Sequence, residues 1–196
     1  MRDAPTAHTR VSTDLSPARL IAGSAQRVSI LGAPTVGASG GSVVFDGKRD
    51  GVLIPRLGEF AGATRFDVCV RVKPHPAGSF EQRFFHIQDS ASNDRFLMEI
   101  RLDPDGSWYA DSYFESGGTH ALLQDPALRH ASGVWTTYRV SYDGSELTQF
   151  VNGVRELSAP FPARRLPLVG VVSIGIRATR EYPFCGEVGD VLIASW

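Results

Sequence analysis

The sequence has few cysteines, no long apolar run and almost no net charge. Its two cysteines, Cys69 and Cys185, are too few for a disulfide scaffold and lack the spacing of a metal motif. They could form one disulfide or remain free thiols, and the sequence leaves both alternatives open. No apolar run reaches the roughly 18 residues that a membrane-spanning helix needs, so no membrane span is predicted. The net charge of −1 excludes the basic surface that nucleic-acid binding requires.

The rest of the composition indicates an ordinary globular chain. Hydrophobic residues make up 42% and charged residues 21% of the 196 positions. A chain of this size buries roughly 70% of its unfolded surface, so its core needs neither a metal ion nor a disulfide. Residues 1–10 contain no apolar segment of the kind found in secretion signals, and no internal repeat is visible.

Short segments with a period of two alternate with Gly and Pro turns along most of the chain. Residues 65–73 are the clearest example, because every second residue is apolar. Strands are predicted at 27–31, 42–45, 51–55, 65–73, 83–88, 95–102, 107–114, 135–142, 147–152, 169–177 and 187–194. Many short strands with such turns predict an all-β fold, an antiparallel two-sheet β-sandwich.

Four further local expectations accompany the strands. A short helical turn is predicted at 16–22, with Ser16 as its cap and Pro17 in its first position. Residues 115–133 are predicted to be a long irregular segment, and loops of this kind often determine specificity. Trp135, Tyr138, Val140 and Tyr142 are expected between the sheets. Gly186 is expected where the last strand approaches another backbone closely.

Five pieces of the sequence resemble laminin G-like jelly-roll domains of the concanavalin A-like lectin/glucanase superfamily. The pieces are 43–47 with 51–55, 66–74, the hairpin around 105–106, 135–153, and 184–193. Each piece is degenerate, but their order and spacing are typical of that fold. The resemblance covers about residues 26–196, so residues 1–25 are interpreted as an N-terminal extension that joins the sandwich.

The resemblance carries further expectations. It favours a secreted or cell-surface protein, although the compartment cannot be read from these residues. Domains of this type often bind calcium through loop carboxylates, and the expected ligands are Asp46 and Asp190. Because the same fold carries lectins, adhesion modules, glycosidases and polysaccharide lyases, the resemblance does not specify one function.

The residues that point away from the core on strands 95–102 and 107–114 form the candidate binding site. If the two strands pair across the turn at 103–106, five side chains share one patch. These are Glu99, Arg101, Tyr109, Asp111 and Tyr113. Aromatic faces with charged hydrogen-bonding partners suit a sugar, whose ring has an apolar face and a polar rim. The alternative is a solvated sheet face with cross-strand ion pairs.

Two enzymatic alternatives use the same fold. Glu99, Arg101 and Asp103 depart from the Glu-x-Asp-x-Glu pattern of laminarinase-type glucanases, because an arginine between two carboxylates should hold both ionised. A polysaccharide lyase would use His86, Glu99, Arg101 and Tyr113 as catalytic residues, with Gln88 nearby. There Arg101 would neutralise a uronate, and His86 or Tyr113 would move the proton. The lysine-containing aromatic motif of such lyases is absent from the C-terminal part of the sequence.

These observations favour a non-catalytic module that binds carbohydrate in a lectin-like manner. The first alternative is a lyase or glycoside hydrolase of the same fold, which would have a deep cleft with titratable groups of shifted pKa. The second is an adhesive or structural module with a protein partner, which would expose an apolar patch and form oligomers. The sequence does not determine the oligomeric state.

Overall fold

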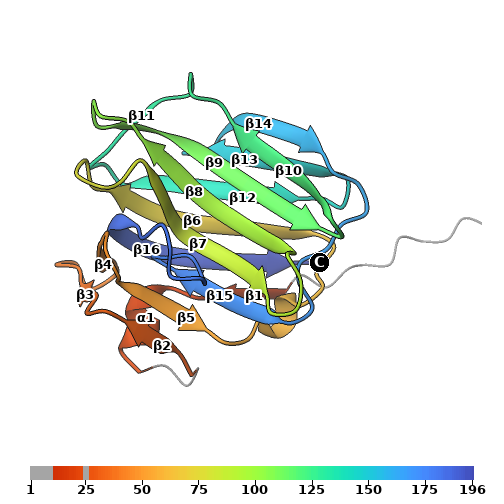
Figure 1. Ribbon diagram of the computed structural model, residues 1–196, viewed down its shortest axis with the longest axis horizontal. Coiled ribbons are helices and arrows are strands. Elements are labelled where there is room, and N and C mark those ends of the chain that lie inside the picture. Colours follow the sequence, from red (N-terminus) through yellow and green to blue (C-terminus); the bar gives the residue numbers. More distant parts are fainter. Residues whose placement is uncertain (1–10, 24–26) are drawn as a thin grey trace, which may run out of the picture.

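Two antiparallel sheets lie face to face and enclose the core (Figure 1). The computed structural model describes residues 11–23 and 27–196. Within these residues, sheet A runs in the order β14 (Val154–Pro160), β13 (Glu146–Val151), β12 (Thr136–Tyr142), β6 (Phe66–Pro74), β16 (Cys185–Ser195), β4 (Val43–Asp46) and β3 (Thr35–Val36), with β1 (Val11–Asp14) paired to β16. Sheet B runs in the order β10 (Thr119–Gln124), β9 (Ser107–Ser116), β8 (Arg95–Leu102), β7 (Glu81–Asp89), β15 (Gly170–Ile174), β5 (Gly51–Ile54) and β2 (Ser29–Leu31), with β11 (His130–Ala131) paired to β9. The predicted two-sheet sandwich is confirmed.

The core forms where the apolar faces of the two sheets meet. Phe66 of β6 is fully buried, and its ring centroid lies 5.3 Å from that of Phe96 and 5.5 Å from that of Phe114, both on sheet B. Such edge-to-face pairs stabilise the sandwich beyond the apolar area that they bury. Of the aromatic residues expected between the sheets, Tyr138 and Tyr142 are buried there. The prediction for Trp135 was wrong, because this ring is half-buried on the outside of sheet A under the guanidinium of Arg71.

The segment predicted to be irregular is largely β-structure. Strand β10 covers residues 119–124 and β11 covers 130–131, and both pair with β9. Residues 119–124 have buried side chains at only two positions because they lie at the edge of the sheet, so their apolar signal is weak. The sequence reading also missed β1, β3 and β14, which are short or exposed.

The described part of the N-terminal extension is joined to the sandwich. Strand β1 pairs with the end of β16, and the predicted helical turn is the helix α1 (Pro17–Ile21). The Ser16 side chain does not cap this helix. It donates instead to Asp14 and accepts a hydrogen bond from the Val191 backbone N–H, which ties the extension to sheet A. A single-turn 3-10 helix, η1 (Gly58–Phe60), follows β5.

Gly186 and the two cysteines settle two of the sequence-based questions. A Cβ atom at Gly186 would lie 2.4 Å from the Lys73 carbonyl oxygen, so the expected close approach to β6 requires glycine. Cys69 lies opposite Leu192, whereas Cys185 lies opposite Asp46, and both thiols are free.

Among the described helices, none has the length and apolarity needed to cross a membrane.

Candidate functional site

The hairpin of β8 and β9 brings the five predicted ligand-binding residues onto one outer face of sheet B. In its register Glu99 lies opposite Asp111, Arg101 opposite Tyr109, and Leu97 opposite Tyr113. Together with the neighbouring strands these residues form what we call the groove face. Its members are Glu81, Arg83, His86 and Gln88 of β7, Arg95, Leu97, Glu99 and Arg101 of β8, Tyr109, Asp111, Tyr113 and Glu115 of β9, and His120, Leu122 and Gln124 of β10. Their shared face is an observation, whereas their role in binding stays a prediction.

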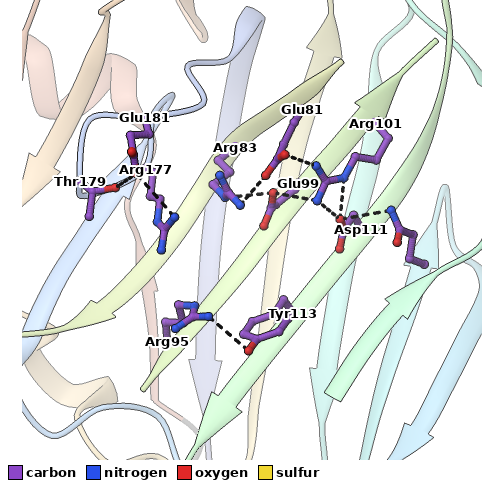
Figure 2. A network of polar contacts seen from close by, with 11 residues as sticks. Glu81, Arg83, Arg95, Glu99, Arg101, Asp111, Tyr113, Arg177, Thr179 and Glu181 are labelled. Carbon is purple, nitrogen blue, oxygen red and sulfur yellow. Dashed lines mark hydrogen bonds and ion pairs between the residues drawn. The ribbon is translucent and has the colours of Figure 1, made fainter. Parts of the chain in front are cut away.

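A network of ion pairs crosses three strands at the centre of the groove face (Figure 2). The Arg101 guanidinium contacts Asp111 through Nε at 2.8 Å and through Nη2 at 2.6 Å. It also contacts Glu81 at 2.7 Å and Glu99 at 3.6 Å. On the other side, Arg83 contacts Glu99 at 2.9 Å and Glu81 at 2.7 Å. Two arginines therefore share three carboxylates, and the cluster forms a rigid charged floor.

The electrostatic expectation for Glu99 was wrong. Asp103 does not contact Arg101 but pairs with Arg129, so Arg101 does not lie between the two predicted carboxylates. Burial raises the pKa of Glu99 to about 7, because the side chain is almost fully enclosed and the nearby guanidinium groups do not fully offset its desolvation. Burial also raises the pKa of Asp111. Near neutral pH the floor therefore contains a carboxyl group that is only partly ionised.

The two tyrosines of the predicted site differ in their availability. Tyr113 is half-buried, stacks on His120 with ring centroids 5.2 Å apart, and accepts a hydrogen bond from Arg95 at 3.2 Å. The Arg95 guanidinium also lies over the ring, 4.8 Å from its centroid, so Tyr113 is fixed by Arg95 and His120 beside the hollow. Tyr109 is buried, and the Arg129 guanidinium lies over its ring. Tyr109 supports the floor instead of offering a stacking surface.

A shallow hollow of about 230 Å³ opens on the groove face. It is lined by Arg83, Arg95, Leu97, Glu99, Arg101, Asp111, Tyr113, Leu122, Gln124 and Arg177. Two exposed rings stand beside its arginines: Phe80 at 54% exposure lies against Arg101, and Tyr182 at 37% lies against Arg83. Such a hollow is smaller than the pockets that enclose drug-sized ligands, and it suits a ligand that lies along the surface.

Sequence reasoning missed Phe80 and Tyr182 because both lie in loops without periodicity. Arg177 was assigned to the predicted strand 169–177, but β15 ends at Ile174, so Arg177 lies in the loop that follows. The loop at 177–183 has two residues, Arg180 and Tyr182, with φ of 67° and 53°. Residues other than glycine rarely adopt this left-handed conformation, and such strain often occurs at functional sites. The Arg83 backbone N–H donates to the Tyr182 carbonyl oxygen at 3.0 Å, so the loop is held against β7. The Tyr182-Pro183 pair is the one feature of the sequence that points to this loop.

The structure does not assemble the predicted lyase residues. His86 lies opposite Leu97, and Leu97 lies opposite Tyr113, so an apolar side chain separates the two proposed proton-transfer groups. His86 is fully buried, and its Nδ1 atom accepts a hydrogen bond from the Ala178 backbone N–H. Burial, followed by the nearby guanidinium of Arg177, lowers the pKa of His86 to about 3. Gln88 donates to backbone carbonyls of the turn at 89–92 and is engaged there.

The residues expected to bind calcium do not come together. Asp46 lies opposite Cys185, and Asp190 is five residues further along β16, roughly 15 Å away at the usual rise of a strand. Asp46 accepts backbone N–H groups of Lys48, Arg49 and Asp50 as a turn cap. Burial alone would raise the pKa of Asp46, but these hydrogen bonds lower it. Within residues 11–23 and 27–196 no three His, Cys, Asp or Glu side chains are grouped to hold a metal ion. The residues therefore do not fit a calcium site.

The two antiparallel sheets form a sandwich of the laminin G-like, jelly-roll class. The chain belongs to the concanavalin A-like lectin/glucanases superfamily, whose laminin G family model matches residues 46–195. No curated protein sequence matches the chain significantly.

Solved structures share the fold at low sequence identity. Domain 4 of the arabinanase AbnA from Geobacillus stearothermophilus, solved with arabinotriose, is 20% identical with a TM-score of 0.60, over 85% of this chain and 75% of that one. The sialidase module CBM40 of Ruminococcus gnavus, bound to sialyllactose, is 16% identical with a TM-score of 0.56, over 68% and 76%. Domains LG4-5 of the mouse laminin α1 chain are 15% identical with a TM-score of 0.61, over 84% and 44%.

Proposed function

We propose that this chain is a non-catalytic carbohydrate-binding module whose ligand lies on the groove face. The observation that carries the proposal is the hollow, which has a charged hydrogen-bonding floor and the rings of Tyr113, Phe80 and Tyr182 beside it. A sugar ring can stack its apolar face on an aromatic ring while its hydroxyl groups exchange hydrogen bonds with charged side chains. The complexes of AbnA domain 4 and of CBM40 with oligosaccharides support the proposal, because both are sandwiches of this fold.

Strand β10 gives the groove face its outer side. Leu122, which is 49% exposed, and Gln124 both line the hollow. Both belong to the segment that the sequence analysis selected as a determinant of specificity. We therefore propose that β10 contributes to the choice of sugar, because two of its side chains line the hollow.

The outer face of sheet A is the less suitable surface. It has a hollow of about 660 Å³ lined by Ser12, Asp67, Cys69, Arg139, Leu192, Ile193 and Ala194. Arg139 is paired with Asp67 at 3.0 Å and covers the ring of Phe150. No aromatic side chain lines this hollow within the described chain, so a sugar ring would find no stacking surface there.

The raised pKa of Glu99 is the observation that favours an enzyme as the second candidate. Glu99 and Asp111 both contact the Nη2 atom of Arg101, so the contacting oxygens lie no more than about 6 Å apart, near the separation in retaining glycosidases. Both carboxyl side chains are nonetheless only 2% exposed and fixed by arginines. This enclosure favours a structural role for the pair.

A protein partner is the third candidate. Large apolar side chains are exposed on several separate elements, for example Ile30 on β2, Val154 on β14 and Leu168 in a loop. An adhesive module would form oligomers or bind a partner through one continuous patch. Size-exclusion chromatography with light scattering measures this property directly.

A glycan-array screen, run with calcium and with a chelator, tests the proposal. Each bound glycan is also incubated with the protein and analysed for cleavage products. Binding without cleavage supports the module, and equal binding with chelator excludes a calcium requirement. Cleavage would instead support the glycosidase alternative, whereas no binding to any glycan would contradict the proposed function.

Replacing Tyr113 with alanine should weaken binding of an array-positive glycan about tenfold, because a stacking ring contributes roughly 1.4 kcal/mol. Isothermal titration calorimetry measures the change. Tyr113→Phe keeps the ring and should bind within about threefold of the wild type. Phe150→Ala, which removes a ring from the outer face of sheet A, is the matched control and should leave affinity unchanged. Equal affinity of wild type and Tyr113→Ala would place the sugar elsewhere.

A further inference from the structure

One end of the hollow contains guanidinium donors that the protein itself does not use. Among the described residues, Nη1 of Arg83 and Nε of Arg177 have no hydrogen-bond partner although both atoms are buried. Both side chains line the hollow, and that of Arg83 is only 9% exposed. A buried donor without an acceptor costs free energy comparable to a lost hydrogen bond, and more when the group is charged. Such donors indicate a place where a ligand supplies the acceptor.

Arg83 and Arg177 approach the same end of the hollow, from β7 and from the loop, whereas Arg95 lies further along β8 and points to Tyr113 (Figure 2). After burial, the charges of Arg177, Arg83 and Arg95 are the main causes of the lowered pKa of His86. Its Nε2 atom is also buried and has no hydrogen-bond partner among the described residues.

The carboxylates nearby do not fully neutralise these arginines. Arg177 meets only Glu181, at 3.7 Å, and the Glu181 side chain is 60% exposed. Arg83 shares Glu99 with Arg101, and burial raises the pKa of Glu99 to about 7. Arg83 also contacts Glu81, and Arg95 is paired with Glu115 at 2.7 Å, so carboxyl groups meet all four arginines of the lining. What distinguishes this end of the hollow is the set of buried donors on Arg83 and Arg177 that these carboxyl groups do not reach.

Resting on the proposed function, we propose that the ligand is an acidic saccharide and that its carboxylate or sulfate group binds between Arg83 and Arg177. A guanidinium presents parallel N–H groups that match the oxygens of such an anion. Arg101, which the sequence analysis assigned to this task, is occupied by Glu81, Glu99 and Asp111 and holds the floor. The anion site is displaced from Arg101 towards the loop at 177–183.

The experiment compares each acidic glycan with its neutral counterpart on the array. Uronic and sialic acids are compared with their methyl esters, and sulfated glycans with their desulfated forms, so the two arms distinguish a carboxylate from a sulfate. The acidic form should bind at least tenfold more tightly, and the preference should weaken as salt is raised. Arg177→Gln should remove most of this preference while it leaves thermal unfolding nearly unchanged, because Arg177 has one exposed partner.

Arg139→Gln on the outer face of sheet A is the matched control and should keep the preference. Neutral glycans that bind as well as acidic ones, with a loss in Tyr113→Ala, would overturn the anion site and leave the proposed function standing. Acid preference that survives Arg177→Gln would also overturn it. If no glycan binds at all, the proposed function fails and the anion site fails with it.

Discussion

Arg101→Met should lower the free energy of unfolding by about 3–5 kcal/mol near pH 8, the largest effect of any single charge on the groove face. The guanidinium contacts Asp111, Glu81 and Glu99, and the side chains of Asp111 and Glu99 are only 2% exposed. Methionine fills a similar volume but leaves these carboxylates without their shared cation. Removing one partner of a buried ion pair is costly because the other charge stays buried and unpaired. Denaturant unfolding followed by circular dichroism measures the loss.

The pH dependence of this loss identifies its cause. Because burial raises the pKa values of Glu99 and Asp111, part of the unpaired negative charge disappears on acidification, and the loss of stability should shrink at pH 5. Arg129→Met is the control, since Arg129 is 43% exposed and pairs with Asp103 at the surface. It should cost less than about 1 kcal/mol. An equal loss in both variants, or a loss independent of pH, would mean that packing and not charge explains the result.

Glu99→Gln should strongly change the pH dependence of stability. The folded-state pKa of Glu99 is about 7 against an ordinary value of 4.5. Its contribution to the stability of the fold is therefore fully present below pH 4.5 and is lost as the pH rises through 7. This lost stability amounts to about 3 kcal/mol at pH 8. Glutamine imitates the protonated carboxyl group and carries no such penalty. The variant should therefore be more stable than the wild type at pH 8 and similar to it at pH 4.5.

His86 changes the free energy of unfolding with pH in the opposite direction to Glu99, and this makes the Glu99→Gln experiment more decisive. Its pKa falls from 6.5 to about 3, so its contribution is present above pH 6.5 and is lost as the pH falls towards 3. In the wild type the contributions of Glu99 and His86 change in opposite directions between about pH 4.5 and 6.5, so the free energy of unfolding should vary little with pH there. In Glu99→Gln only the contribution of His86 should remain, and stability should rise with pH over this range. Urea unfolding at half-unit pH steps measures both curves.

Glu187→Gln on sheet A is the control of opposite sign. Burial alone would raise the pKa of Glu187, but hydrogen bonds from Ser42 and Lys73 lower it. That variant should lose a little stability at neutral pH, by less than about 1 kcal/mol, because the group is partly exposed. If Glu99→Gln is clearly less stable than the wild type at pH 8, the ion pair with Arg83 dominates and Glu99 is ionised throughout.

Most of the sandwich could be predicted because its central strands are buried on one face. In β6 and β8 every second side chain enters the core, so apolar residues recur with a period of two along residues 66–72 and 96–102. The hairpin turn at 103–106 then fixed which residues of β8 and β9 share a face. The grouping of Glu99, Arg101 and Asp111 followed from the same alternation. These are local patterns, and local patterns can be read from one sequence.

The parts that could not be predicted depend on contacts between distant segments. Residues 154–160 form a strand because β13 offers it an edge, although none of its side chains is fully buried. Glu81 and Arg101 are far apart in the sequence and meet only through the pairing of β7 with β8. Tyr182 reaches the groove because a loop folds back on β7. Neither alternation nor turn chemistry carries this information.

The pairing of β1 with β16 determines how the domain can be tethered. Val11 lies opposite Ser195, so two positions near opposite ends of the chain are neighbours on sheet A, whereas the groove face belongs to sheet B. A linker attached at either position leaves from the same point and from the other layer of the sandwich. Insertion into a loop of a host protein would need little rearrangement, because the two attachment points are already adjacent. A surface that holds the domain by this point would leave the groove turned towards solution, open to a polymer too large to enter a pocket.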